Sequence, residues 1–238
     1  MKTGALAIAV ATACANDAHE RMHQVDNRSA AVGNALPAWC WDSVEVRALA
    51  CSNQTARRVG ETLYVRLTNG SEVSYVDVNA GEDDGGYRYV GRSPRPPLHV
   101  VQSYGHETAP SWLFVDERTG RGVSVNDEPV VSADSTRFVT VAEPDWNNCA
   151  ERNQPSLDVW RFTDTLPVLE WRLVSWDCRR QSGWGPTAPH WRGPDTLEFI
   201  RNEEIVRDTA TKTRTSVEHL TSHGAAVRDR KGWRVIPK

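Results

Sequence analysis

Short segments in which apolar and polar residues alternate, separated by turn residues, run through most of the chain after residue 39. Residues 61–67 (ETLYVRL) and 72–78 (EVSYVDV) both alternate, and Asn69-Gly70 lies between them. Alternation with a period of two places apolar side chains on one face of a β-strand, and Asn-Gly is a typical hairpin turn. The pattern predicts an antiparallel hairpin and, repeated along the chain, an all-β fold.

Further strands are expected wherever the same alternation recurs between Gly, Pro, Asn and Asp residues. These segments are residues 87–92, 98–103, 111–116, 123–125, 156–162 and 167–174. Helical spacing of apolar residues is weak throughout, and the best candidate for a helix is residues 213–223 near the C-terminus.

One pattern occurs twice in the second half of the chain. Residues 128–141 (EPVVSADSTRFVTV) and 188–201 (APHWRGPDTLEFIR) each contain a Pro, a large apolar residue, a turn that carries Asp and an alternating strand. With the strands between them, each unit predicts a four-stranded antiparallel meander.

Residues 128–201 resemble the blades of β-propellers, particularly the TolB-type repeats of bacterial exported proteins, which open with a Ser-x-Asp turn such as Ser132-Ala133-Asp134. Residues 87–125 fit a preceding blade. The resemblance implies a small or incomplete β-propeller of antiparallel four-stranded meanders, with a β-sandwich as the alternative.

In such a meander, the loop between the second and third strands emerges at the same edge as the loop that leads to the next meander. We therefore expect residues 143–155 and 175–187 to lie side by side. Aromatic residues and Arg are favoured in binding surfaces. The two loops predict a binding face made of Trp146, Trp176, Trp184, Asp145, Asp177, Arg179 and Arg180.

Four cysteines follow Cys14, and four cysteines allow three disulfide connectivities. Local pairing, Cys40–Cys51 and Cys149–Cys178, is the simplest of the three. The second pair joins the two long loops that the meander places at one edge. Such bonds persist in an oxidising compartment, for example the bacterial periplasm.

The N-terminus has the layout of a secretory signal peptide. In residues 1–15 (MKTGALAIAVATACA), Lys2 precedes an apolar stretch that ends in small residues. Cleavage after Ala15 would release a soluble chain, whereas lipidation of Cys14 would anchor the protein to a membrane. We expect a flexible arm at residues 16–38, one β-rich domain at 39–238, and a location in the periplasm or at the outer membrane.

Charge and hydropathy exclude two classes of protein. The 28 Lys and Arg residues are balanced by 31 Asp and Glu residues, so the formal net charge of −3 gives no general attraction to nucleic acid. No apolar run approaches the ~20 residues of a membrane-spanning helix.

A metallopeptidase is the sharpest catalytic alternative. His19, Glu20 and His23 match H-E-x-x-H, in which two imidazoles bind zinc and the Glu activates water. The motif directly follows the signal peptide, and a third ligand would have to come from a distant residue such as His106, Glu107, His219 or His223. Those last two histidines form a second pair spaced by four residues, which fits an exposed helix face better than a metal site.

Other catalytic and metal motifs are incomplete. Residues 77–84 resemble a calcium loop, but Gly81 stands where a ligand is required, so an acidic hairpin tip is expected. No G-x-S-x-G or phosphate-binding loop occurs. The many carboxylates leave a glycosidase pair open.

We therefore expect an exported binding protein without a cofactor, whose loop face meets a protein, peptide or glycan of the cell envelope. An inhibitor or immunity protein would fit this description. A periplasmic hydrolase, either the zinc peptidase or a carboxylate-based glycosidase, is the alternative.

Overall fold

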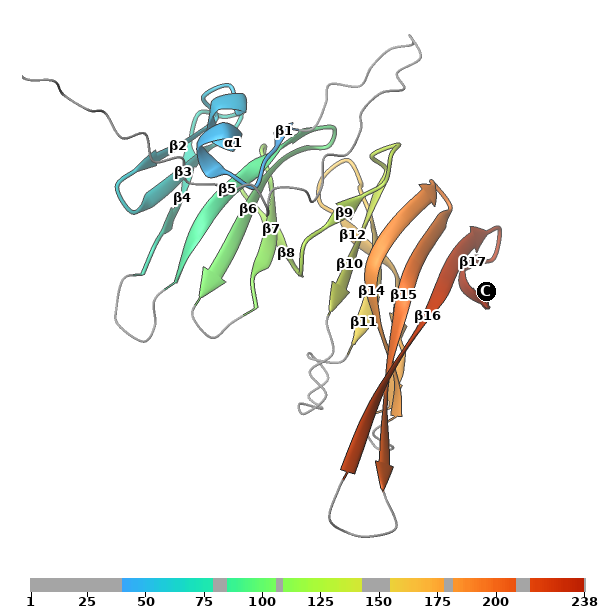
Figure 1. Ribbon diagram of the computed structural model, residues 1–238. Helices are drawn as coiled ribbons and strands as arrows, with labels where there is room; N and C mark the ends of the chain where they lie inside the picture. Colours follow the sequence, from blue (N-terminus) through green and yellow to red (C-terminus); the bar gives the residue numbers. More distant parts are fainter. Residues whose placement is uncertain are drawn as a thin grey trace, which may run out of the picture. The chain divides into compact units, whose positions relative to one another are not determined.

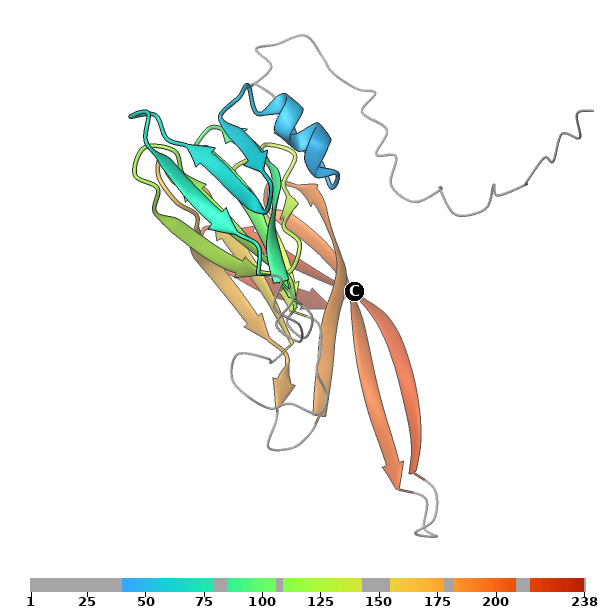
Figure 2. The ribbon, with the colours of Figure 1, turned by 90° about the vertical axis from the view of Figure 1, so that its left-hand side faces the viewer.

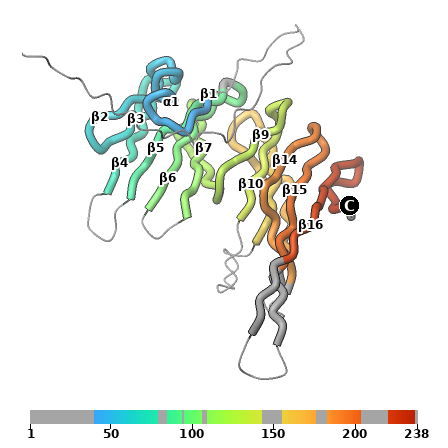
Figure 3. Tube along the Cα trace, viewed as in Figure 1, coloured from blue at the N-terminus to red at the C-terminus, as the bar shows by residue number. Residues whose placement is uncertain are grey.

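The computed structural model describes residues 40–78, 85–105, 109–142, 155–177, 182–208 and 215–237, and Figure 3 traces the course of the chain. In these residues the chain forms four antiparallel sheets in sequence order and one short helix (Figure 1). The predicted all-β fold of antiparallel meanders is confirmed. No helix among these residues has the length and hydropathy of a membrane-spanning segment.

The first sheet is a three-stranded meander of β2 (Ala56–Val59), β3 (Thr62–Arg66) and β4 (Glu72–Val76). The Asn-Gly turn forms as expected, with Gly70 at a φ of +85° that favours glycine. The Gly70 N–H donates to the carbonyl oxygen of Leu67 at 2.9 Å.

Before this sheet lie β1 (Cys40–Trp41) and α1 (Glu45–Cys51), a helix that the alternation in the sequence did not predict. The helix is held by its Glu45 carboxylate, which accepts hydrogen bonds from the Arg58 guanidinium and from the Tyr89 backbone N–H. The predicted disulfide Cys40–Cys51 is confirmed, with Cα atoms 5.9 Å apart. It ties β1 to the end of α1.

The second sheet contains the strands predicted as the preceding blade. In order, β5 (Gly85–Pro94), β6 (Pro97–Gly105), β7 (Ser111–Asp116) and β8 (Gly122–Asn126) form a meander, and β1 pairs with the outer side of β5.

The third sheet is the meander that the sequence indicated most clearly. Its strands are β9 (Val130–Val131), β10 (Arg137–Ala142), β11 (Ser156–Arg161) and β12 (Val168–Val174).

The Ser-x-Asp turn connects β9 to β10. The Asp134 carboxylate accepts hydrogen bonds from the Ser132 hydroxyl at 2.7 Å and from the Thr136 N–H at 3.1 Å. The Ser132 hydroxyl oxygen also accepts a bond from the Arg137 N–H at 3.1 Å. These side chains therefore fix the turn locally.

The fourth sheet is built from β13 (Trp176–Asp177), β14 (Ser182–Gly193), β15 (Thr196–Asp208), β16 (Thr215–Asp229) and β17 (Gly232–Pro237). The helix predicted at residues 213–223 is wrong, because β16 occupies this part of the chain. β16 pairs with β15 from Thr196↔Val227 to Asp208↔Thr215 (Figure 2). This long pairing overrides the weak local helical spacing.

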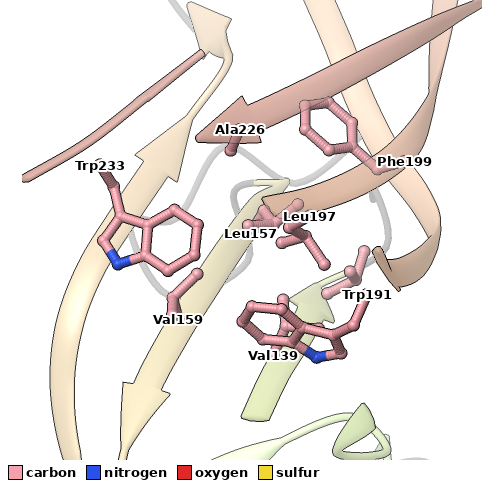
Figure 4. Packing of buried hydrophobic residues seen from close by; sticks show 9 residues of the cluster. Val139, Leu157, Val159, Trp191, Leu197, Phe199, Ala226 and Trp233 are labelled. Atoms are coloured by element: carbon pink, nitrogen blue, oxygen red, sulfur yellow. The ribbon is translucent and has the colours of Figure 1, made fainter. Parts of the chain in front are cut away.

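Three apolar layers lie between consecutive sheets. The first layer includes Leu63, Val65, Tyr89 and Val101; the second includes Val100, Phe114, Phe138 and Phe162; the third includes Val139, Leu157, Trp191, Leu197 and Trp233 (Figure 4). Successive side chains of a strand point to opposite faces. Accordingly, Phe138 belongs to the second layer and its neighbour Val139 to the third, and both are fully buried.

Candidate binding cleft

The connection between β10 and β11 begins and ends at one edge of the third sheet, the edge formed by strand ends, and β12 ends at the same edge. Ala142, the last residue of β10, lies opposite Ser156, the first residue of β11. Ser156 lies in turn opposite Val174, the last residue of β12. The chain therefore leaves β10 and β12 at the same edge, as expected. The predicted loop at residues 175–187 is wrong for most of its length, because Trp176–Asp177 form β13 and residues 182–187 belong to β14.

Four residues of the predicted loop face lie outside the described residues, namely Asp145, Trp146, Arg179 and Arg180. Cys149 and Cys178, the predicted disulfide pair, lie outside them as well. The backbone of Trp176 and Asp177 forms β13, which pairs with β14. The disulfide Cys149–Cys178 stays a prediction.

Trp184 is described, and its ring packs beside the third core layer. The ring is stacked on Phe199, with centroids 5.6 Å apart, and the Arg201 guanidinium lies 4.7 Å from the Trp184 ring centroid. These contacts give Trp184 a packing role at the margin of the core.

A cavity of about 330 Å³ lies next to the edge where Ala142, Ser156 and Val174 meet. One wall is the face of the third sheet that carries Thr140, Asp158, Trp160 and Arg172, and the other wall is residues 124–126 of β8. We call this cavity the edge cleft.

The centre of the edge cleft is an ion pair across neighbouring strands. The Arg172 Nε and Nη2 atoms donate to the two carboxylate oxygens of Asp158 at 2.8 and 2.6 Å. Asp158 is only 6% exposed, whereas half of the Arg172 side chain is exposed. The hydrogen bond to Asp158 raises the pKa of Arg172, which therefore stays charged.

An aromatic side chain forms the inner end of the edge cleft. Trp160 donates its Nε1–H to the Thr140 hydroxyl oxygen at 3.3 Å. Its ring is nearly parallel to that of Phe138, with an interplanar angle of 5° and centroids 5.9 Å apart. The hydrogen bond and the stacking fix the indole, which is half-buried, in one orientation.

Thr140, Asp158, Trp160 and Arg172 are not among the residues predicted for the binding face. A signal for them exists, because Ser156, Asp158 and Trp160 alternate with Leu157 and Val159 in a segment predicted to be a strand. The apolar residues belong to the third core layer. The alternation therefore indicates that the opposite face of the same strand carries polar and aromatic side chains.

A second buried polar network lies between the first two sheets and serves the fold. His99 is fully buried; its Nδ1 lies 3.1 Å from the Tyr89 hydroxyl and its Nε2 lies 3.2 Å from the Arg66 carbonyl oxygen. Burial lowers the pKa of His99 and raises the pKa of Tyr89. Arg92 pairs with the nearby, almost fully buried Glu117.

Metal sites are not found in the described part of the chain, where no three His, Cys, Asp or Glu side chains gather. His19, Glu20, His23, His106 and Glu107 lie outside that part, so the zinc motif stays a prediction.

Asp77 is the first residue of the segment that resembles a calcium loop, and its carboxylate contacts protein groups. It pairs with Arg58 at 2.8 Å and accepts a hydrogen bond from the Tyr87 N–H at 2.8 Å. Residues 79–84 lie outside the described residues.

The fold and the edge cleft together define an all-β protein of consecutive antiparallel meanders with a polar cleft at one sheet edge. No protein-family model matches the chain, and no curated protein or solved structure is significantly similar to it.

Proposed function

We propose that this chain is an exported binding protein of a bacterial envelope that holds its partner at the edge where Ala142, Ser156 and Val174 meet. The observation that carries the proposal is the position of the edge cleft, which lies beside the ends of the connection from β10 to β11 and beside the last residue of β12. Loops on a rigid scaffold are a common place for binding residues.

Export is supported by the signal-like N-terminus and by the Cys40–Cys51 bond. Such bonds are rare in reducing compartments. We place the mature protein in the periplasm or at the outer membrane.

Binding is favoured over hydrolysis by the charges of the edge cleft. Glycoside hydrolysis needs two carboxyl groups on either side of the scissile bond. Among the described residues that line the cleft, Asp158 is the single carboxylate, and Arg172 engages both of its oxygens. This arrangement orients a polar partner without supplying an acid and a base.

The loop face can be tested apart from the edge cleft. Replacing Trp146, Arg179 and Arg180 together by Ala should abolish the capture of an envelope component by the immobilised protein. The matched control is Arg234→Ala, which removes an exposed side chain of the fourth sheet and should capture as well as wild type. Equal capture by the triple variant would refute the proposed face.

A further inference from the structure

We infer that the edge cleft binds a neutral saccharide unit. This inference rests on the proposed function, because it names the class of ligand that the envelope-binding edge would take. Four properties of the cleft support it: its size, its charge, its hydrogen-bonding groups and its aromatic end.

Size favours a small ligand. A volume of about 330 Å³ is at the lower end of the range of small-molecule sites, roughly 300–1,000 Å³. It fits a sugar ring at the end of a chain.

Charge favours a neutral ligand. Asp158 and Arg172 are the charged side chains among the described lining, and they neutralise each other. The described lining thus carries no net charge that would attract an anion or a cation. Separating a pair in which one partner is 6% exposed leaves a buried charge without compensation, which is costly.

The hydrogen-bonding groups suit hydroxyls. Each sugar hydroxyl is both a donor and an acceptor. The two bonds from Arg172 use about half of the lone-pair positions of the Asp158 carboxylate and two of the roughly five guanidinium N–H groups. The Thr140 hydroxyl oxygen accepts from Trp160, so its own O–H is oriented away from that bond. The remaining N–H groups of Arg172 and the remaining lone pairs of Asp158 therefore lie close together. Neighbouring hydroxyl groups of a sugar need such a donor and such an acceptor side by side.

Trp160 gives the cleft an apolar platform. The C–H face of a sugar ring is apolar and packs on an aromatic ring, while the hydroxyl groups at its rim reach polar side chains. Phe138 holds the indole parallel to itself, so the platform is in place before a ligand arrives.

The position of these polar residues argues against a purely structural role. Thr140, Ser156 and Asp158 are 4%, 9% and 6% exposed, and they lie on the same face of the sheet as Phe138. Polar groups placed at such positions stabilise a fold less than apolar ones. A ligand that uses them explains why an apolar layer is interrupted here.

The test is binding of the mature protein to an array of neutral oligosaccharides with hexose, N-acetylhexosamine and deoxyhexose termini, printed beside sulfated and uronic-acid forms. We expect a neutral glycan to bind. Affinity measured by calorimetry should fall at least tenfold in Trp160→Ala, stay within threefold of wild type in Trp160→Phe, and be unchanged in Arg234→Ala. Thermal unfolding of each variant shows whether it is folded.

Binding of anionic forms only, absence of binding to every neutral glycan, or equal affinity of folded Trp160→Ala would overturn the inference. Capture of an envelope protein through Trp146, Arg179 and Arg180, with no glycan bound, would sustain the proposed function and refute the saccharide. Absence of both would refute the two proposals together.

Discussion

The carbonyl group of Cys40 lies directly against Gly91, which directly follows the register shift in the pairing of β5 with β6. A Cβ atom built on Gly91 would be 1.8 Å from the Cys40 carbonyl oxygen. Real Cβ atoms do not approach backbone this closely, so only glycine allows β1 to pair with β5 at this point.

Gly91→Ala should therefore displace β1 and destabilise the protein by about 1–3 kcal/mol, as overpacking of a filled site does. Urea unfolding followed by circular dichroism measures the change. The matched control is Gly193→Ala, because a Cβ at Gly193 would meet no atom within 4 Å. Equal losses in the two variants would contradict the close approach.

Acid should weaken the contact between the third and fourth sheets through Glu170, whose carboxylate pairs with Arg137 at 2.6 Å and with Arg228 at 3.0 Å. Burial alone would raise the pKa of Glu170, but the hydrogen bond and the charges of these arginines lower it below its ordinary value of 4.5. Below about pH 4.5 the unfolded chain thus binds a proton that the folded chain does not. The stability that Glu170 contributes is present above this pH and is lost as the pH falls through the folded pKa.

Glu170→Gln should make the free energy of unfolding less dependent on pH between pH 5 and the folded pKa than it is in wild type. Urea titrations at a series of pH values measure this. If the variant keeps the wild-type slope, Glu170 does not carry the proposed share of the acid sensitivity.

A second disulfide, Cys149–Cys178, should be present in the exported protein. Proteolysis without reduction, followed by mass spectrometry, should recover the two cysteines in one linked peptide. Their removal as a pair should cost about 2–4 kcal/mol, because a crosslink restricts the unfolded chain. Recovery of either cysteine linked to Cys40 or Cys51 would contradict both this pairing and the described one.

The N-terminal segment should be absent from the mature chain. Intact-mass measurement after export should show either a chain that starts at residue 16 or a lipid-modified Cys14, and Cys14→Ser distinguishes these forms by the loss of palmitate labelling. Recovery of a periplasmic chain that still begins at residue 1 would refute both signals.

Local patterns predicted the third sheet because its turn, strands and edges are all specified by residues close in sequence. Asp134 and its neighbours close the turn, and the alternation of Leu157 and Val159 marks a buried face. The helix α1 was missed because contacts from distant residues, Arg58 and Tyr89, hold its first residue.

The edge cleft was missed for a related reason. The alternation in β11 is visible in the sequence, but the pairing of Asp158 with Arg172 depends on the register between two strands. Only that register, together with the nearby β8, brings a carboxylate, a guanidinium and an indole to one cavity.

Because β10 is buried on both faces, the burial of apolar side chains does not by itself select its register with the neighbouring strands. A strand that shifts by one residue normally turns its apolar side chains toward water, and this penalty rejects the error. In β10 a shift by one residue would move Phe138 into the third apolar layer and Val139 into the second, so neither side chain would reach water. The correct register of β10 is therefore selected by polar contacts in the turn before the strand. These contacts are made by the hydroxyl of Ser132 and the carboxylate of Asp134.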